Sequence, residues 1–148
     1  MGGVAMLKFV LPITPTTQAR PRVTVRGKFA HAYKTADQKA NERSLEACLL
    51  QYQPATPLSG PVVLEFVAAL PISRSDSKKT VQAKLNGEIA PTKKPDLDNL
   101  TKQLKDAMTR MQFWHDDSQV VCLRCDKIFA ESGYWEVLVY EAVRRLGE

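Results

Sequence analysis

A largely apolar stretch from Val62 to Leu70 constrains the fold of this chain most strongly. Its length suits a β-strand, and a strand with so little polar alternation is expected near the centre of a sheet. The chain has 148 residues, 44% of them hydrophobic, which is enough to enclose such a strand in a core of its own. We therefore expect one domain that spans residues 1–148.

Further segments have the patterns of strands and helices. Strands are expected at residues 6–11, 22–25, 29–33, 119–129 and 134–140, and the second and third flank a basic hairpin turn at Arg26-Gly27-Lys28. Helices are expected from Thr35 to about Gln51, with Leu45, Cys48 and Leu49 buried, and from the segment Ser73–Lys79 to near Asn86-Gly87. This order of elements predicts an α+β fold with a mixed sheet packed by helices.

A third helix is expected to begin around Asp98, with Asp98 as a candidate N-cap. Its buried stripe follows from apolar residues at three- and four-residue spacing: Leu97, Leu100, Leu104, Met108 and Met111. Asp98, Lys102 and Asp106 lie four residues apart and share a polar face. Pro95 disfavours helix before it, so Asp96 is expected in extended or turn geometry. The linker from Glu88 to Pro95 is expected to be exposed.

The charge distribution suggests a polyanionic partner. The formal net charge is +5, and no acidic residue precedes Asp37. A second basic run leads into Lys93 and Lys94. Basic surfaces attract nucleic acid by phosphate neutralisation, although charge alone is better explained by a solvated basic face. No signal peptide or membrane helix is expected, and three cysteines fit a reducing cytoplasm better than a disulfide framework.

Carboxylates gather in two short segments of this basic chain. Asp96 and Asp98 stand in Lys94-Pro95-Asp96-Leu97-Asp98-Asn99-Leu100, and Asp116 and Asp117 follow Phe113-Trp114-His115. Clustered carboxylates suit Mg²⁺, which takes oxygen ligands and leaves room for phosphate and water. The alternative to a metal site is a structural role, with Asp98 as an ordinary helix N-cap and Asp116-Asp117 as part of an ordinary turn. An EF-hand from Asp96 fails, because Thr101 and Ala107 replace the required Gly and Glu.

These motifs resemble the signature of the RusA-type Holliday junction resolvases. The resemblance rests on residues 94–100, on Lys102, on Asp106-Ala107-Met108 and on Phe113-Trp114 through Asp116-Asp117-Ser118-Gln119-Val120. It implies a homodimeric, Mg²⁺- or Mn²⁺-dependent endonuclease that cuts four-way DNA junctions symmetrically. Such a protein would be bacterial or phage-encoded, would act at the nucleoid, and would need no small-molecule cofactor.

The resemblance also implies the roles of individual residues. The essential carboxylates map onto Asp96, Asp98 and Asp117, and the functional lysine maps onto Lys102. Asp116 is matched as a further ligand or as an orienting residue. Ser73–Pro91 resembles an insertion of the phage-type branch. Candidate DNA contacts are basic residues spread along the chain: Arg20, Arg22, Arg26, Lys28, Lys78, Lys79, Lys94 and Lys127.

Several other features favour structural roles. Cys122 and Cys125 have zinc-like spacing but face opposite sides of a strand, so unligated thiols are expected. His115 is a candidate metal neighbour or an incidental loop residue, and Phe113 and Trp114 are expected to pack beneath the site. Two other classes remain open: a branched-DNA-binding protein without cleavage activity, and a structural dimer with a calcium-stabilised loop.

Overall fold

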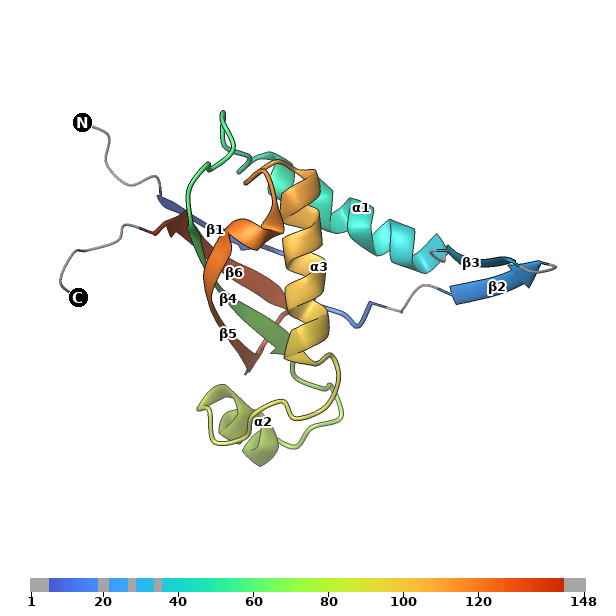
Figure 1. The fold of residues 1–148 in the computed structure, drawn as a ribbon. Helices are drawn as coiled ribbons and strands as arrows, with labels where there is room; N and C mark the ends of the chain where they lie inside the picture. The colour runs from blue at the N-terminus through green and yellow to red at the C-terminus, as the bar shows by residue number, and fades with distance from the viewer. Residues whose placement is uncertain (1–5, 19–21, 27–28, 34–35, 143–148) are drawn as a thin grey trace.

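A mixed β-sheet forms the centre of the protein in a computed structural model that describes residues 6–18, 22–26, 29–33 and 36–142 (Figure 1). Its strands are β1 (Met6–Leu11), β4 (Val62–Pro71), β5 (Val120–Ala130) and β6 (Tyr134–Glu141). They lie in the order β1-β6-β4-β5. β4 pairs parallel with β5 and antiparallel with β6, and β6 pairs antiparallel with β1. The predicted α+β class and the inner position of β4 are confirmed.

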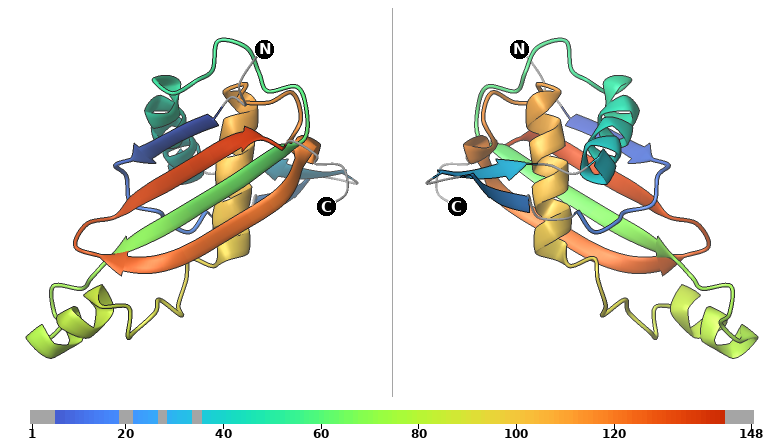
Figure 2. Two further views of the ribbon diagram at one scale, coloured as in Figure 1. Left: turned by 90° about the vertical axis from the view of Figure 1, so that its left-hand side faces the viewer. Right: turned by 90° about the vertical axis from the view of Figure 1, so that its right-hand side faces the viewer.

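Two helices cover one face of this sheet (Figure 2). They are α1 (Ala36–Leu50) and α3 (Leu97–Arg110). α3 buries the predicted stripe, with Leu100, Leu104 and Met108 fully enclosed against β4 side chains in one core. α1 adds Leu45 and Leu49 to the same core, while Cys48 is half-buried. None of the helices in the described part combines the length and apolarity needed to span a bilayer.

The connection between β5 and β6 differs from a simple hairpin, because β4 lies between the two strands. Gly133 in this connection packs closely against the segment that follows β1. A Cβ atom at Gly133 would lie 2.8 Å from the Thr14 Cα and 2.4 Å from its Oγ1. The backbone at Thr14 is therefore accommodated only because residue 133 lacks a side chain.

Gly133→Ala is expected to lower the free energy of unfolding by about 1–3 kcal/mol, because overpacking against backbone forces a local shift. Gly60→Ala is the matched control, since a Cβ at Gly60 would meet no atom within 4 Å. Chemical denaturation of both variants measures the difference. Equal stability of the two variants would contradict the close approach at Thr14.

A small lobe around α2 (Lys78–Leu85) follows β4. The Ser77 hydroxyl caps the helix by accepting a hydrogen bond from the Thr80 N–H at 3.2 Å. The helix ends at Asn86, and Gly87 adopts a φ of 80°. Lys84 ties the lobe to the sheet, because its ammonium lies 2.6 Å from Asp76 and 4.4 Å from the centre of the Phe129 ring. The linker 88–95 is exposed as predicted, except for the buried Pro91 and Pro95.

The lobe should loosen at acidic pH. The hydrogen bond from the Lys84 ammonium lowers the pKa of Asp76, and the Ser73 N–H lowers it further. A lowered folded-state pKa gives stability that is complete above the ordinary carboxyl value of about 3.9 and is lost as the pH falls through the folded value. At pH values lower than about 4, the amide protection factors in α2 should therefore decrease. Asp76→Asn should show the reduced protection already at neutral pH, whereas Glu88→Gln, which lies just beyond α2, should not.

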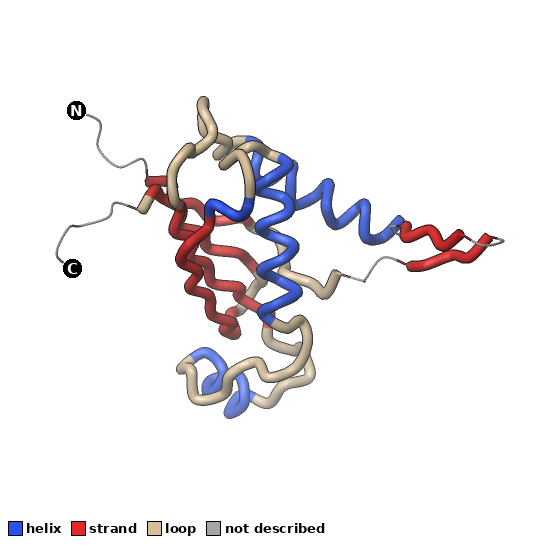
Figure 3. Tube along the Cα trace, in the orientation of Figure 1, coloured by secondary structure: helices blue, strands red, loops and turns tan. Residues whose placement is uncertain are grey.

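The predicted basic hairpin is present as β2 (Arg22–Arg26) and β3 (Phe29–Tyr33), which pair antiparallel in a separate two-stranded sheet. Figure 3 shows the hairpin extending beyond the N-terminal end of α1, away from the four-stranded sheet. Its backbone is described, and its side chains lie outside the described part of the structure.

Candidate active site

The first aspartate of the motif begins α3. Asp96 is the N-cap, and its Oδ1 accepts a hydrogen bond from the Asn99 N–H at 3.1 Å. The helix thus begins at Leu97, close to the predicted start around Asp98, and the alternative in which Asp98 itself is the N-cap is wrong. Aspartate is among the best N-caps, and Pro95 holds the preceding backbone out of the helix. Asp98 consequently lies in the first turn, exposed, near the positive end of the helix dipole.

The second pair of aspartates forms a short 3₁₀ turn, η1 (Asp117–Gln119). Asp116 caps this turn through a 2.8 Å hydrogen bond from the Ser118 N–H to its Oδ1. The bonds from Ser118 lower the pKa of Asp116 and keep it ionised. The Gln119 side chain completes a capping box by accepting from the Asp116 N–H at 2.9 Å.

Gln119 also fixes the place of the turn. Its Nε2 donates to the carbonyl oxygens of Leu58 at 2.8 Å and Gly60 at 3.0 Å, just before β4. Beneath the turn, Phe113 and Trp114 are buried, as predicted, and the Trp114 indole donates to the Thr109 hydroxyl at 2.7 Å. Asp117 is therefore presented from an anchored backbone. The aspartate followed three residues later by glutamine was a capping-box signal that the sequence analysis overlooked.

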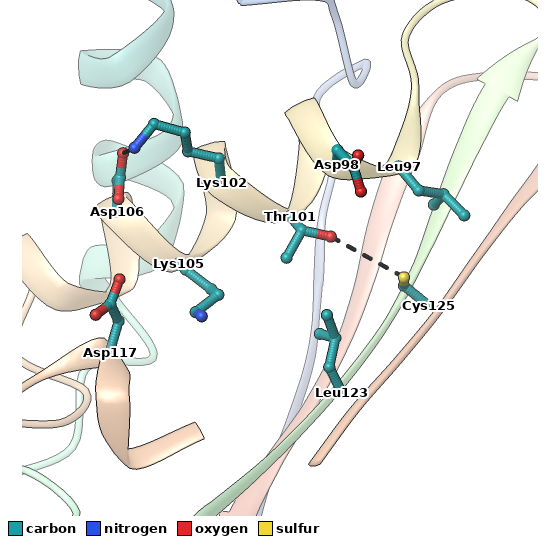
Figure 4. A pocket seen from close by; sticks show the side chains of 9 residues that line it. All are labelled: Leu97, Asp98, Thr101, Lys102, Lys105, Asp106, Asp117, Leu123 and Cys125. Carbon is teal, nitrogen blue, oxygen red and sulfur yellow. Dashed lines mark hydrogen bonds and ion pairs between the residues drawn. The ribbon is translucent and has the colours of Figure 1, made fainter. Parts of the chain in front are cut away.

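Asp98 and Asp117 face one open cavity of about 290 Å³ (Figure 4). Asp98 comes from α3 and Asp117 from η1, and β5 supplies the floor with Leu123 and Cys125. The remaining lining residues also come from α3: Leu97, Thr101, Lys102, Lys105 and Asp106. The cavity thus places acidic groups from separate pieces of backbone around a space lined by lysines.

Comparison with known proteins identifies the family of this chain. The family model described as "Endodeoxyribonuclease RusA" matches residues 12–140. The chain belongs to the RusA endodeoxyribonuclease family. "Uncharacterized protein YqaN" of Bacillus subtilis (strain 168) is 34% identical over 137 residues, covering 91% of this chain and 96% of that protein. "Crossover junction endodeoxyribonuclease rusA" of Lactococcus phage r1t is 31% identical over 135 residues, covering 90% of this chain and 95% of that protein.

The expected RusA-type carboxylate set is only partly assembled. Asp98 and Asp117 line the same cavity, whereas Asp96 and Asp116 serve as caps. Within the described ranges, no group of three or more His, Cys, Asp or Glu residues is placed to hold a metal ion together. Asp98, Asp106 and Asp117 all line the cavity, and Asp106 is paired with Lys102, so Asp98 and Asp117 remain as the candidate metal ligands there rather than a complete protein cage.

The lysine matched to the RusA motif is engaged with its own helix. The Lys102 ammonium lies 3.1 Å from Asp106 Oδ2, one helical turn away, and 76% of the side chain is exposed. Figure 4 shows this pair at one end of the cavity, while Lys105 extends into the space between Asp117 and Leu123. The sequence analysis assigned no role to Lys105, although it comes seven residues after Asp98.

Lys127 supports the segment that enters the motif. Its ammonium donates to the carbonyl oxygens of Lys93 at 3.1 Å and Pro95 at 3.0 Å. These bonds hold the backbone immediately before Asp96 against β5. The side chain that we expected to meet DNA from the sheet surface is thus bonded within the protein.

The other candidate DNA contacts lie at the edges of the described structure. Lys78, Lys79 and Lys94 are exposed on α2 and the linker. Arg20 and Lys28 lie outside the described residues, and Arg22 and Arg26 begin and end β2. Cys122 and Cys125 form no disulfide bond within the described residues, and Cys122 is exposed while Cys125 is half-buried.

Asn99 was another residue without an assigned role, although it lies inside the motif. Its side chain forms a reciprocal pair with the Gln18 backbone, accepting from the N–H at 2.8 Å and donating to the carbonyl at 2.9 Å. The buried Gln103 donates to Asn99 at 2.8 Å and to the Thr16 carbonyl at 2.6 Å. These bonds attach the segment that leads to the basic hairpin directly to α3.

Proposed function

We propose that this protein is a divalent-metal-dependent endodeoxyribonuclease that resolves four-way DNA junctions by paired symmetric cleavage, in recombination and repair. The observation that carries the proposal is the cavity shared by Asp98 and Asp117, which come from separate elements and stand among lysines. The name of the phage relative supports the substrate class. A homodimer in the bacterial cytoplasm would match the twofold symmetry of the junction.

The residues present fit a hard divalent cation. Mg²⁺ in proteins usually binds through one or two carboxylates and completes its coordination with water and substrate phosphate. Asp98 and Asp117 would hold it, and Asp96 could join them because its cap uses only Oδ1. We assign Asp116 an orienting role instead, because as the cap of η1 it holds the turn that presents Asp117. When bound, Mg²⁺ or Mn²⁺ would activate water and stabilise charge at the phosphate.

The proposed reaction is hydrolysis of one phosphodiester bond in each of two strands. A water oxygen adds to phosphorus, the bond between phosphorus and the 3′ oxygen breaks, and that oxygen takes up a proton, leaving a 5′-phosphate and a 3′-hydroxyl. Lys102 supplies positive charge to the phosphate by exchanging its partner Asp106 for DNA. This exchange is inexpensive, because exposed ion pairs contribute little.

Basic residues outside the cavity would steer the DNA backbone without reading its sequence. Lys78, Lys79 and Lys94 lie on the α2 lobe and the linker that leads to α3. By their charge alone, the further candidates for DNA backbone contacts are Arg20, Arg22, Arg26 and Lys28. Lys127 contributes by holding the backbone before Asp96.

A labelled synthetic four-way junction, incubated with and without Mg²⁺, tests the function. Paired nicks at symmetric positions, only with the metal, are the expected result. A mobility shift without nicks under any metal would instead indicate a branched-DNA-binding protein, and the enzyme proposal would fail. A linear duplex of the same sequence is the control for junction selectivity.

A further inference from the structure

Two lysines of α3 line the cavity, and they differ in their surroundings. Lys102 is largely exposed and paired with Asp106. Lys105 is half-buried, and within the described part of the chain its ammonium makes neither an ion pair nor a hydrogen bond. Because Lys105 is half-buried and its ammonium has no partner among the described residues, it can bind an anion without first breaking an ion pair, whereas Lys102 must first release Asp106.

The helix period explains the position of Lys105. Residues 98 and 105 are seven apart, so they lie on the same side of α3 about 10 Å apart along its axis. The helix contacts both η1 and β5 on this side. In Figure 4 the Lys105 side chain extends toward the space between Asp117 and Leu123, with Asp98 at the far end of the cavity. Acidic groups and a lysine thus border one space from different directions.

The charged residues of the cavity differ in whether they already have an ion-pair partner. The cavity lining contains Asp98, Asp106 and Asp117, and its lysines are Lys102 and Lys105. Until DNA displaces Asp106 from Lys102, Lys105 is the cavity lysine whose ammonium has no ion-pair partner among the described residues. No described acidic group approaches the Lys105 ammonium within the 4.0 Å of an ion pair.

We propose that Lys105 is a catalytic residue of this site, whose ammonium donates to a non-bridging oxygen of the phosphodiester held between Asp98 and Asp117. This inference rests on the proposed nuclease function and adds a second lysine to it. Lys105 keeps its proton throughout and acts as a fixed charge, stabilising the negative charge that develops on the phosphate.

Lys105→Met tests the proposal, because methionine preserves an unbranched apolar stem and removes the charge. Its single-turnover cleavage rate on a four-way junction with Mg²⁺ is expected to fall about 100-fold, the scale of losing one oxyanion donor. Lys105→Arg should retain most of the rate. Lys39→Met on α1 removes an equal charge from an exposed position and should cut like the wild-type protein.

The salt dependence of junction affinity, measured without metal, is a second test, because it would not change if Lys105 had only a structural role. The slope of log affinity against log salt should fall by about 0.9 in Lys105→Met, as for one lost phosphate contact, and stay unchanged in Lys39→Met. Thermal denaturation checks folding, and Lys105→Gln replaces the methionine variant if that protein unfolds.

A rate for folded Lys105→Met within twofold of wild type would overturn the inference, whatever the salt slope. The failure of the underlying function looks different: wild-type protein would then make no metal-dependent cuts, and the inference would fall with it. Loss of rate in Lys105→Met beside normal cutting by Lys39→Met and Lys105→Arg is the supporting outcome.

Discussion

Asp98→Asn is expected to abolish cleavage of a four-way junction and to leave junction binding intact or tighter. Asp98 is exposed on the first turn of α3 and lines the cavity that it shares with Asp117. Asparagine keeps the size of the side chain and removes the negative charge that a divalent cation requires. Binding survives because one less negative charge opposes the DNA phosphates. The loss of rate should exceed the 10–100-fold typical of residues that only orient a metal ligand.

Two measurements are needed on the same preparation: the single-turnover rate with Mg²⁺, and the affinity for the junction without metal. Glu88→Gln is a suitable control, because it removes an exposed acidic charge beyond α2. Retained cleavage by Asp98→Asn would refute the assignment of this carboxylate. Loss of both cleavage and binding would point to misfolding, which the denaturation midpoint of the variant would reveal.

The adjacent aspartates should respond very differently to the same substitution. Asp117→Asn is expected to lower the cleavage rate by more than about 100-fold, as the loss of a ligand should exceed that of a residue supporting one. Asp116→Asn should stay within about tenfold of the wild-type rate, because asparagine caps a turn about as well as aspartate. The reason is structural: Asp117 lines the cavity, while Asp116 accepts the Ser118 N–H.

The rate ratio of these two variants is the informative quantity, since they have the same net charge and the same chemical change. Equal and severe losses would mean that Asp116 also binds the metal. Equal and negligible losses would remove η1 from the active site altogether.

The fold was largely predictable because its strongest signals are local. The spacing of Leu100, Leu104 and Met108 admits a helix with one buried face, and the structure buries that face. The apolar stretch beginning at Val62 likewise favoured an inner strand, and β4 lies between β6 and β5. The sequence did not indicate that β4 lies between β5 and β6, because pairing partners depend on contacts far apart along the chain.

The site was less predictable than the fold. The resemblance identified Asp98 and Asp117, and the structure brings them to one cavity. It did not distinguish the capping aspartates, because Asp96 and Asp116 have the same chemistry as their neighbours and differ only in the backbone that they face. Lys105 was overlooked because its relation to Asp117 depends on the packing of α3 against η1, which lies outside the helical pattern.

Diffraction from crystals grown with Mn²⁺, recorded at a wavelength where manganese scatters anomalously, tests the shared metal site most directly. We predict an anomalous peak in the cavity, within coordination distance of carboxylate oxygens from both Asp98 and Asp117. The peak should disappear in crystals of Asp98→Asn. A peak that contacts neither side chain, or a cavity without manganese at saturating concentration, would contradict the account.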